Sequence, residues 1–295
     1  MYIEQFTKYI ESEKRFSLHT LTAYTKDLEQ FFSYINNQYN PSSIHDIDHH
    51  MIRSWIVSLV NNDIKPRSIN RKLSTLKSYY KFLRKENLAS ENPLIKIPPL
   101  KPEKKLPEFV SQEKMDLLLD DVEFENNFEG TRNKLIIEIL YFTGMRLSEL
   151  TGLKDSDIDL EKQQLKVIGK RNKERIIPFE QNLKNSLYTY ISIRNSEFEK
   201  SESEDNFLLT SKGRKIYNKL VYRVVNLYLS RVSTLQKTSP HILRHTFATH
   251  MLNNGADLNA IKELLGHANL SATQVYTHNT IDKLKTIYKQ AHPRA

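Results

Sequence analysis

The chain has 295 residues, of which 39% are apolar and 27% charged, which is typical of a globular protein large enough for two domains. It contains no cysteine, which excludes disulfides and thiolate metal sites, and its formal net charge of +9 favours a polyanionic partner. The most apolar stretch, residues 135–142, is far shorter than the ~20 residues of a membrane span. The N-terminal residues do not have the pattern of a signal peptide, so we expect a cytoplasmic protein with no membrane partner.

Four segments in the first hundred residues have apolar positions at helical spacing. Proline at position 66 suits the first turn of the last of them. Four helices with short connections predict a small bundle over residues 1–90. The segments are 2–13, 18–35, 49–60 and 66–87.

The last of these segments is strongly basic, with apolar residues between its cations. One face of such a helix can pack into the bundle while the other meets phosphates and releases their counterions. A merely solvated face is the alternative. We predict double-stranded DNA as the partner, with contacts from Lys65, Arg67, Arg71, Lys72 and Lys77.

Five prolines between positions 92 and 107 mark a boundary after the bundle. They exclude a continuous helix, so residues 91–110 are assigned to an extended linker. The remainder, 111–295, has a mostly helical pattern, with one alternating segment at 164–179. Its turn residues predict a β-hairpin with Lys170 at the tip. The fold class is therefore mainly α, with a small antiparallel hairpin in the second domain.

Several cations and one tyrosine of the second domain follow an order that suits phosphodiester chemistry. Cleavage of a phosphodiester without a metal requires a nucleophile, a proton route and positive charge beside the phosphorus. Each residue alone has an ordinary explanation, such as an ion pair between Arg146 and Glu149. Together they provide every group that the reaction needs. The candidates are Arg146, Lys170, His241, Arg244, His267 and Tyr276.

Metal and nucleotide cofactors are not expected. His241 and His245 have the i,i+4 spacing of zinc ligands, but the guanidinium of Arg244 between them would repel a metal ion. The sequence also lacks the glycine-rich Gly-Lys-Ser/Thr loop that holds nucleotide phosphates.

These motifs resemble those of the tyrosine recombinase (phage integrase) family over nearly the whole chain, with the Xer branch most similar. Arg171 departs from the glycine common after the hairpin lysine, and it adds a candidate DNA contact. The resemblance implies a SAM-like core-binding bundle and a catalytic domain with a C-terminal interaction segment. The matching motifs are Thr-Gly-Met-Arg146, Val-Ile-Gly-Lys170, His241-Ile-Leu-Arg244-His and Gly266-His267, followed by Tyr276.

The resemblance also implies a function and a mechanism. The protein would be a site-specific DNA recombinase in which Tyr276 attacks the scissile phosphate to form a 3′-phosphotyrosyl link. His241 would accept the phenol proton, and Lys170 would protonate the leaving oxygen. A homo- or hetero-tetramer on DNA, assistance by a DNA translocase, and resolution of chromosome dimers at cell division are implied as well.

Alternatives stay open at this point. An integrase of a phage, transposon or integron would carry the same motifs, and a type IB topoisomerase would share the chemistry as a monomer. A non-catalytic DNA-binding protein would keep only the basic bundle. The apolar face of residues 281–290 would pack either on a neighbouring subunit or on its own domain.

Overall fold

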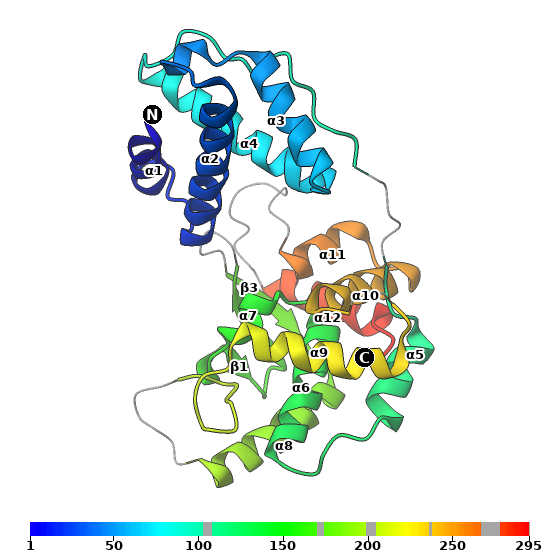
Figure 1. Cartoon of the computed structure of the whole chain (residues 1–295). Helices are drawn as coiled ribbons and strands as arrows, with labels where there is room; N and C mark the ends of the chain where they lie inside the picture. Colours follow the sequence, from blue (N-terminus) through cyan, green and yellow to red (C-terminus); the bar gives the residue numbers. More distant parts are fainter. Residues whose placement is uncertain (103–107, 170–173, 199–204, 236–237, 267–277, 295) are drawn as a thin grey trace. The chain divides into compact units, whose positions relative to one another are not determined.

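The computed structural model describes residues 1–102, 108–169, 174–198, 205–235, 238–266 and 278–294, with side chains only from residue 283 in the last range. The chain divides into two compact units, Met1–Lys105 and Leu106–Ala295 (Figure 1). Within the described ranges, no helix has both the length and the apolar character to cross a membrane.

The first unit is a helical bundle, as predicted. Its aromatic core joins the helices: the ring of Phe6 meets that of Tyr79 edge-on at 5.3 Å, and Phe31 meets Trp55 at 4.9 Å. The last helix begins at Pro66, which occupies the first turn. The helices are α1 (Ile3–Ser12), α2 (Leu18–Tyr39), the short 3₁₀ helix η1 (Ile44–Asp46), α3 (His49–Asn61) and α4 (Pro66–Lys85).

The first part of the expected linker packs on this bundle. Leu94 and Ile97 are buried in its core. The side-chain amide of Asn70 on α4 donates to the carbonyl of Leu100 at 2.8 Å and accepts from its N–H at 2.9 Å. Residues 94–100 are therefore held by the first unit, because this stretch carries apolar side chains as well as prolines.

The second unit is mostly helical and is built around α6, which has α8, α9 and α10 packed against it (Figure 1). The sequence of α6 is apolar on nearly every side, so the helix is buried nearly all round. The helices are α5 (Gln112–Asp116), η2 (Leu117–Asp121), α6 (Phe128–Thr143), α7 (Leu147–Thr151), η3 (Asp155–Asp157), α8 (Gln181–Glu197), α9 (Asn218–Val232), α10 (Pro240–Asn253), α11 (Leu258–Leu265) and α12 (His278–Ala291).

A three-stranded antiparallel sheet completes the second unit, in the order β1 (Ile158–Asp159), β2 (Gln164–Ile168), β3 (Glu174–Pro178). The predicted hairpin of β2 and β3 is confirmed, and its register pairs Val167 with Arg175. The sequence did not indicate β1, because two residues are too short to show a period.

The described part of α12 packs on its own domain, which is one of the two alternatives left open by the sequence. Leu284, Tyr288 and Ala291 are buried in the core of the second unit. The helix contacts β3, α10 and α11.

Candidate active site

A tight turn after α6 positions Arg146 at the start of α7. Gly144 ends α6 with φ of 59°, in the left-handed region. A Cβ at this position would lie 2.5 Å from Cδ1 of Phe247 and 2.8 Å from Cδ2 of Leu265. Glycine is therefore required both for the backbone conformation and for the close approach of α10 and α11. Arg146 follows two residues later and forms the N-cap of α7.

Glu149 holds Arg146 by its side chain and by its backbone. Oε1 accepts from Nη1 of Arg146 at 2.7 Å, and Oε2 accepts from the backbone N–H of Arg146 at 2.8 Å. Arg175 on β3 adds a second guanidinium, with Nη1 2.9 Å from Oε1 and Nη2 2.8 Å from Oε2. The carboxylate thus receives four hydrogen bonds, two on each oxygen, which is its full capacity.

Three arginines meet the last turn of α11. Nε of Arg175 donates to the carbonyl of Leu264 at 2.7 Å, and Nη2 of Arg244 donates to that of Leu265 at 2.7 Å. Nη2 of Arg146 donates to the next carbonyl, that of Gly266, at 3.0 Å. The carbonyl end of a helix carries partial negative charge, so it attracts these cations. The predicted residues Arg146 and Arg244 are therefore brought together, although they lie far apart in the sequence.

The site carries a positive potential at Arg244. Burial, followed by the positive charges of Arg146 and Arg175, lowers the pKa of the Arg244 guanidinium to about 10. The Glu149 carboxylate acts in the opposite direction. Burial alone would raise the pKa of Glu149, but its bonds with Arg175 and Arg146 lower it to about 2. The carboxylate stays ionised and orients the guanidiniums, and the remaining positive potential favours an anion such as a phosphodiester.

His241 lies in the first turn of α10, three residues before Arg244, with its imidazole exposed. Helical spacing places the two side chains on one face of α10. An imidazole on the face that carries Arg244 can exchange a proton with a group bound there.

Four predicted residues lie outside the described ranges: Lys170 and Arg171 in the hairpin turn, and His267 and Tyr276 after α11. The positions that flank them are described. β2 ends at Ile168, β3 begins at Glu174, and α11 is followed by Gly266, which has φ of 66°.

Arg175 was missed by the sequence reasoning. In β3 it is buried on the same face as Ile177, whereas Glu174 is exposed and Ile176 is only partly buried, so Arg175 occupies an inward position where an apolar residue is expected. A charged residue at an inward position of a strand was the signal that could have identified it.

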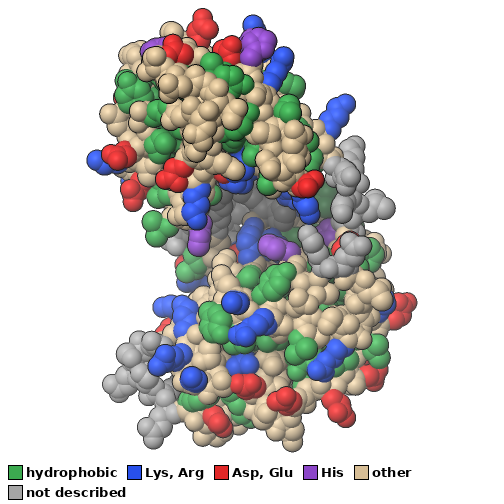
Figure 2. Space-filling view, viewed as in Figure 1, with side chains coloured by type: hydrophobic (Ala, Val, Ile, Leu, Met, Phe, Trp, Pro, Cys, Tyr) green, Lys and Arg blue, Asp and Glu red, His purple; other side chains and the backbone are tan. Residues whose placement is uncertain are grey.

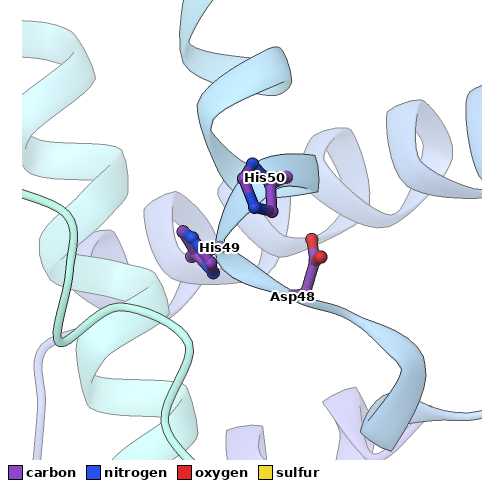
Figure 3. A group of neighbouring side chains, drawn as sticks. All are labelled: Asp48, His49 and His50. Atoms are coloured by element: carbon purple, nitrogen blue, oxygen red, sulfur yellow. The ribbon is translucent and has the colours of Figure 1, made fainter.

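The described residues contain one group of potential metal ligands, Asp48, His49 and His50 in the first unit, at the start of α3 (Figure 3). Asp48 already accepts from the N–H of Met51 at 2.9 Å as the helix N-cap. Desolvation and the positive charges of His50, Lys96 and Arg53 lower the pKa of His49. The same nearby cations would disfavour a metal ion, so we assign no site there.

The predicted DNA-contacting residues of α4 do not all face solvent. Lys65, Arg67, Arg71 and Lys77 are exposed, whereas the side chain of Lys72 is only 13% exposed. Nζ of Lys72 donates to Oδ1 of Asp27 at 2.9 Å and to Oε1 of Gln30 at 2.6 Å. Lys72 therefore serves to join α4 to α2.

Arg71 also bonds to the buried Asp27, with Nη2 2.8 Å from Oδ1, but about half of its side chain remains exposed. Lysine and arginine side chains stand on the faces of both units shown in Figure 2. On α4 the exposed cations recur at helical spacing and form a stripe of Arg67, Arg71, Lys77, Lys81 and Arg84.

Comparison with known proteins agrees with this geometry. Residues 108–283 match the phage integrase family, and residues 3–87 match the N-terminal SAM-like domain of phage integrases. The chain belongs to the phage integrase family, the tyrosine recombinases, which are enzymes that cut and rejoin DNA strands.

Several relatives are similar over almost their full length. The tyrosine recombinase XerC of Chlorobaculum tepidum is 38% identical, with 100% of this chain and 95% of the relative covered. The tyrosine recombinase XerC of Staphylococcus saprophyticus is 40% identical over 97% of this chain and 95% of the relative.

Solved structures share the fold. XerH site-specific recombinase bound to palindromic difH substrate, in a post-cleavage complex, has a TM-score of 0.73 at 23% identity, with 99% of this chain and 82% of that chain covered. The Tn1549 transposon integrase in complex with circular intermediate DNA has a TM-score of 0.70 at 19% identity, covering 95% and 97%.

Proposed function

We propose that this protein is a site-specific recombinase that cuts DNA by forming a 3′-phosphotyrosyl link through Tyr276. The observation that carries the proposal is the convergence of Arg146 and Arg244 on the carbonyl end of α11. In the sequence, His267 and Tyr276 follow this end of the helix. The arginines supply positive potential at Leu265 and Gly266, the last described residues before His267. A phenol has an ordinary pKa near ~10, so its attack at neutral pH needs such help.

Each remaining candidate takes a role that its chemistry suits. The guanidiniums of Arg146 and Arg244 bind the non-bridging oxygens of the phosphate and offset the charge that develops on them. His241 accepts the phenol proton, and His267 donates a hydrogen bond to the phosphate. Lys170, at the turn of the β2–β3 hairpin, protonates the leaving 5′-oxygen. A 5′-hydroxyl from another strand can then reverse the attack, because the covalent link conserves the bond energy.

The basic stripe on α4 contributes affinity for DNA. Its exposed cations can each neutralise a phosphate, and such contacts hold the duplex without reading its sequence. Arg171 extends the same role to the hairpin turn.

The cellular role that we propose is the resolution of chromosome dimers at cell division. Relatives at 37–40% identity over their full length are named as XerC recombinases, which favours this role over an integrase of a mobile element. It implies a cytoplasmic enzyme that acts as a homo- or hetero-tetramer on a recombination site, assisted by a DNA translocase. Binding only to the ends of a mobile element would favour the integrase instead.

Trapping of a covalent adduct on nicked DNA tests the proposal. The natural protein should form an adduct that resists denaturant, with the 3′-phosphate attached to Tyr276. Tyr276→Phe should lose the adduct while still binding DNA, since only the phenol oxygen is removed. An adduct that persists in Tyr276→Phe would reject the assignment of the nucleophile.

A further inference from the structure

Burying the charged side chain of Arg175 on β3 carries a desolvation cost. Its side chain is 4% exposed, and it shares the inward face of the hairpin with Leu165, Val167 and Ile177. An apolar side chain would fill this place without the desolvation of a charge, and buried ion pairs are often no more stabilising than apolar packing. Stability alone therefore does not account for an arginine at this position.

Arg175 contacts Glu149, which holds Arg146, and it also contacts the last turn of α11. Two of its nitrogens saturate Glu149, which holds both the side chain and the backbone of Arg146. Its third nitrogen, Nε, holds the carbonyl of Leu264 at 2.7 Å. Without Arg175, Glu149 would have two unfilled acceptor positions, and its hold on the direction of Arg146 would weaken.

Arg175 also shapes the turn that follows α11. A Cβ on Gly266 would lie 3.1 Å from Nη1 and 3.2 Å from Cδ of Arg175, so the guanidinium packs directly beneath this left-handed turn. The next residue of the chain is His267, and Tyr276 follows nine residues later. Arg175 therefore contacts the last described residue before His267.

From these contacts we infer that Arg175 is a positioning residue for DNA cleavage, which fixes Arg146 through Glu149 and the exit of α11 through Leu264 and Gly266. The inference rests on the proposed function. The planar fork is essential, because one guanidinium makes bonds in three directions, whereas an ammonium acts as a single point charge. Lysine at position 175 should therefore preserve the charge but lose the positioning.

The test compares Arg175→Lys with a matched substitution elsewhere in the second unit. Arg194 is 5% exposed, binds both oxygens of Asp155 at 2.6 and 3.0 Å, and donates to the carbonyl of Phe207 at 2.9 Å. Arg194→Lys thus removes the same kind of fork from a buried arginine, although the Asp155 side chain is 33% exposed. This ion pair joins α8 to η3. Thermal unfolding of both variants measures their stability, and Arg175→Met provides a second, uncharged side chain of similar length.

Single-turnover formation of the covalent adduct at saturating DNA is the first readout. Arg175→Lys should slow it on the order of 10²-fold at unchanged DNA affinity, since a misplacement of about 1 Å has that effect. The defect should persist on a 5′-bridging phosphorothiolate, whose leaving group needs little protonation. Arg194→Lys should cleave at the natural rate. Natural rates in Arg175→Lys and Arg175→Met, or full recovery on the phosphorothiolate, would overturn the inference.

Amide hydrogen exchange in the DNA-free protein is the second readout and does not depend on activity. Exchange at residues 146–149 and 264–266 should accelerate in Arg175→Lys but not in Arg194→Lys. Equal protection in both variants would overturn the positioning role. A natural protein that forms no adduct with any DNA would reject the proposed function, and the exchange result would still decide whether Arg175 holds these segments.

Discussion

Both units bury one carboxylate that binds two cations, but the two networks are built differently. In the first unit, Asp27 on α2 binds Arg71 and Lys72, which are neighbours on α4, so the network joins one helix to another. In the second unit, Glu149 binds Arg146 from the turn before α7 and Arg175 from β3.

The two networks differ in the other groups to which their members are hydrogen-bonded. The three arginines near Glu149 extend to successive carbonyls of Leu264, Leu265 and Gly266. The Asp27 network instead stays between two helices and includes the hydroxyl of Thr75, 2.9 Å from Oδ2. The Asp27 carboxylate joins two helices, whereas the Glu149 carboxylate orients guanidiniums at the end of a helix.

The largest effect is expected when the charge of Glu149 or of Asp27 is removed. Glu149→Gln leaves the buried Arg175 without its counter-charge and should lower the free energy of unfolding by about 3–5 kcal/mol. Asp27→Asn should cost less, about 1–3 kcal/mol, because Arg71 is half exposed and can be hydrated. Urea unfolding of both variants measures the difference, and a larger loss in Asp27→Asn would contradict the comparison.

Removing one cation from each network should separate catalysis from affinity. Arg146→Gln should reduce adduct formation by about 10²–10³-fold, since it removes a donor to the developing charge. Arg71→Gln should weaken DNA binding for all sequences and lower the slope of affinity against salt by about one counterion. Single-turnover cleavage and binding at several salt concentrations measure the two effects. A salt-slope change without a cleavage defect in Arg146→Gln would contradict its assignment.

The sequence predicted the parts of this molecule that rest on a local pattern. The helices of the first unit and the β2–β3 hairpin follow from their periods, and Arg146 and Arg244 could be named from short motifs. Their convergence on α11 could not be derived from those motifs, because it depends on how α10 and α11 approach Gly144. Arg175 was missed because its partners lie 26 and 89 residues away. The side chain of Lys72 was assigned to the surface because a helical period does not reveal a buried carboxylate on another helix.

The two units should also differ in acid sensitivity. His292 in the second unit is stacked on Tyr288 at 5.0 Å, and its Nδ1 accepts from the N–H of Arg294 at 3.2 Å, so the ring is neutral. Burial lowers its pKa to about 3, whereas an unfolded histidine has a pKa near ~6.5. The folded state binds fewer protons below that value, so stability is lost as the pH falls from about 6.5 towards 3, by up to about 1.4 kcal/mol per pH unit.

Two optical signals can assign this loss to the second unit. Trp55 is the only tryptophan of the chain and is buried in the first unit, so its fluorescence follows that unit, while ellipticity follows the helices of both. Between pH 6.5 and 4.5, above the range in which Glu149 takes up its proton, the ellipticity transition should move to lower urea while the Trp55 transition moves less. His292→Phe keeps an aromatic ring beside Tyr288 and removes the titrating group, so it should flatten the ellipticity response. An unchanged slope in His292→Phe would place the acid-sensitive group elsewhere.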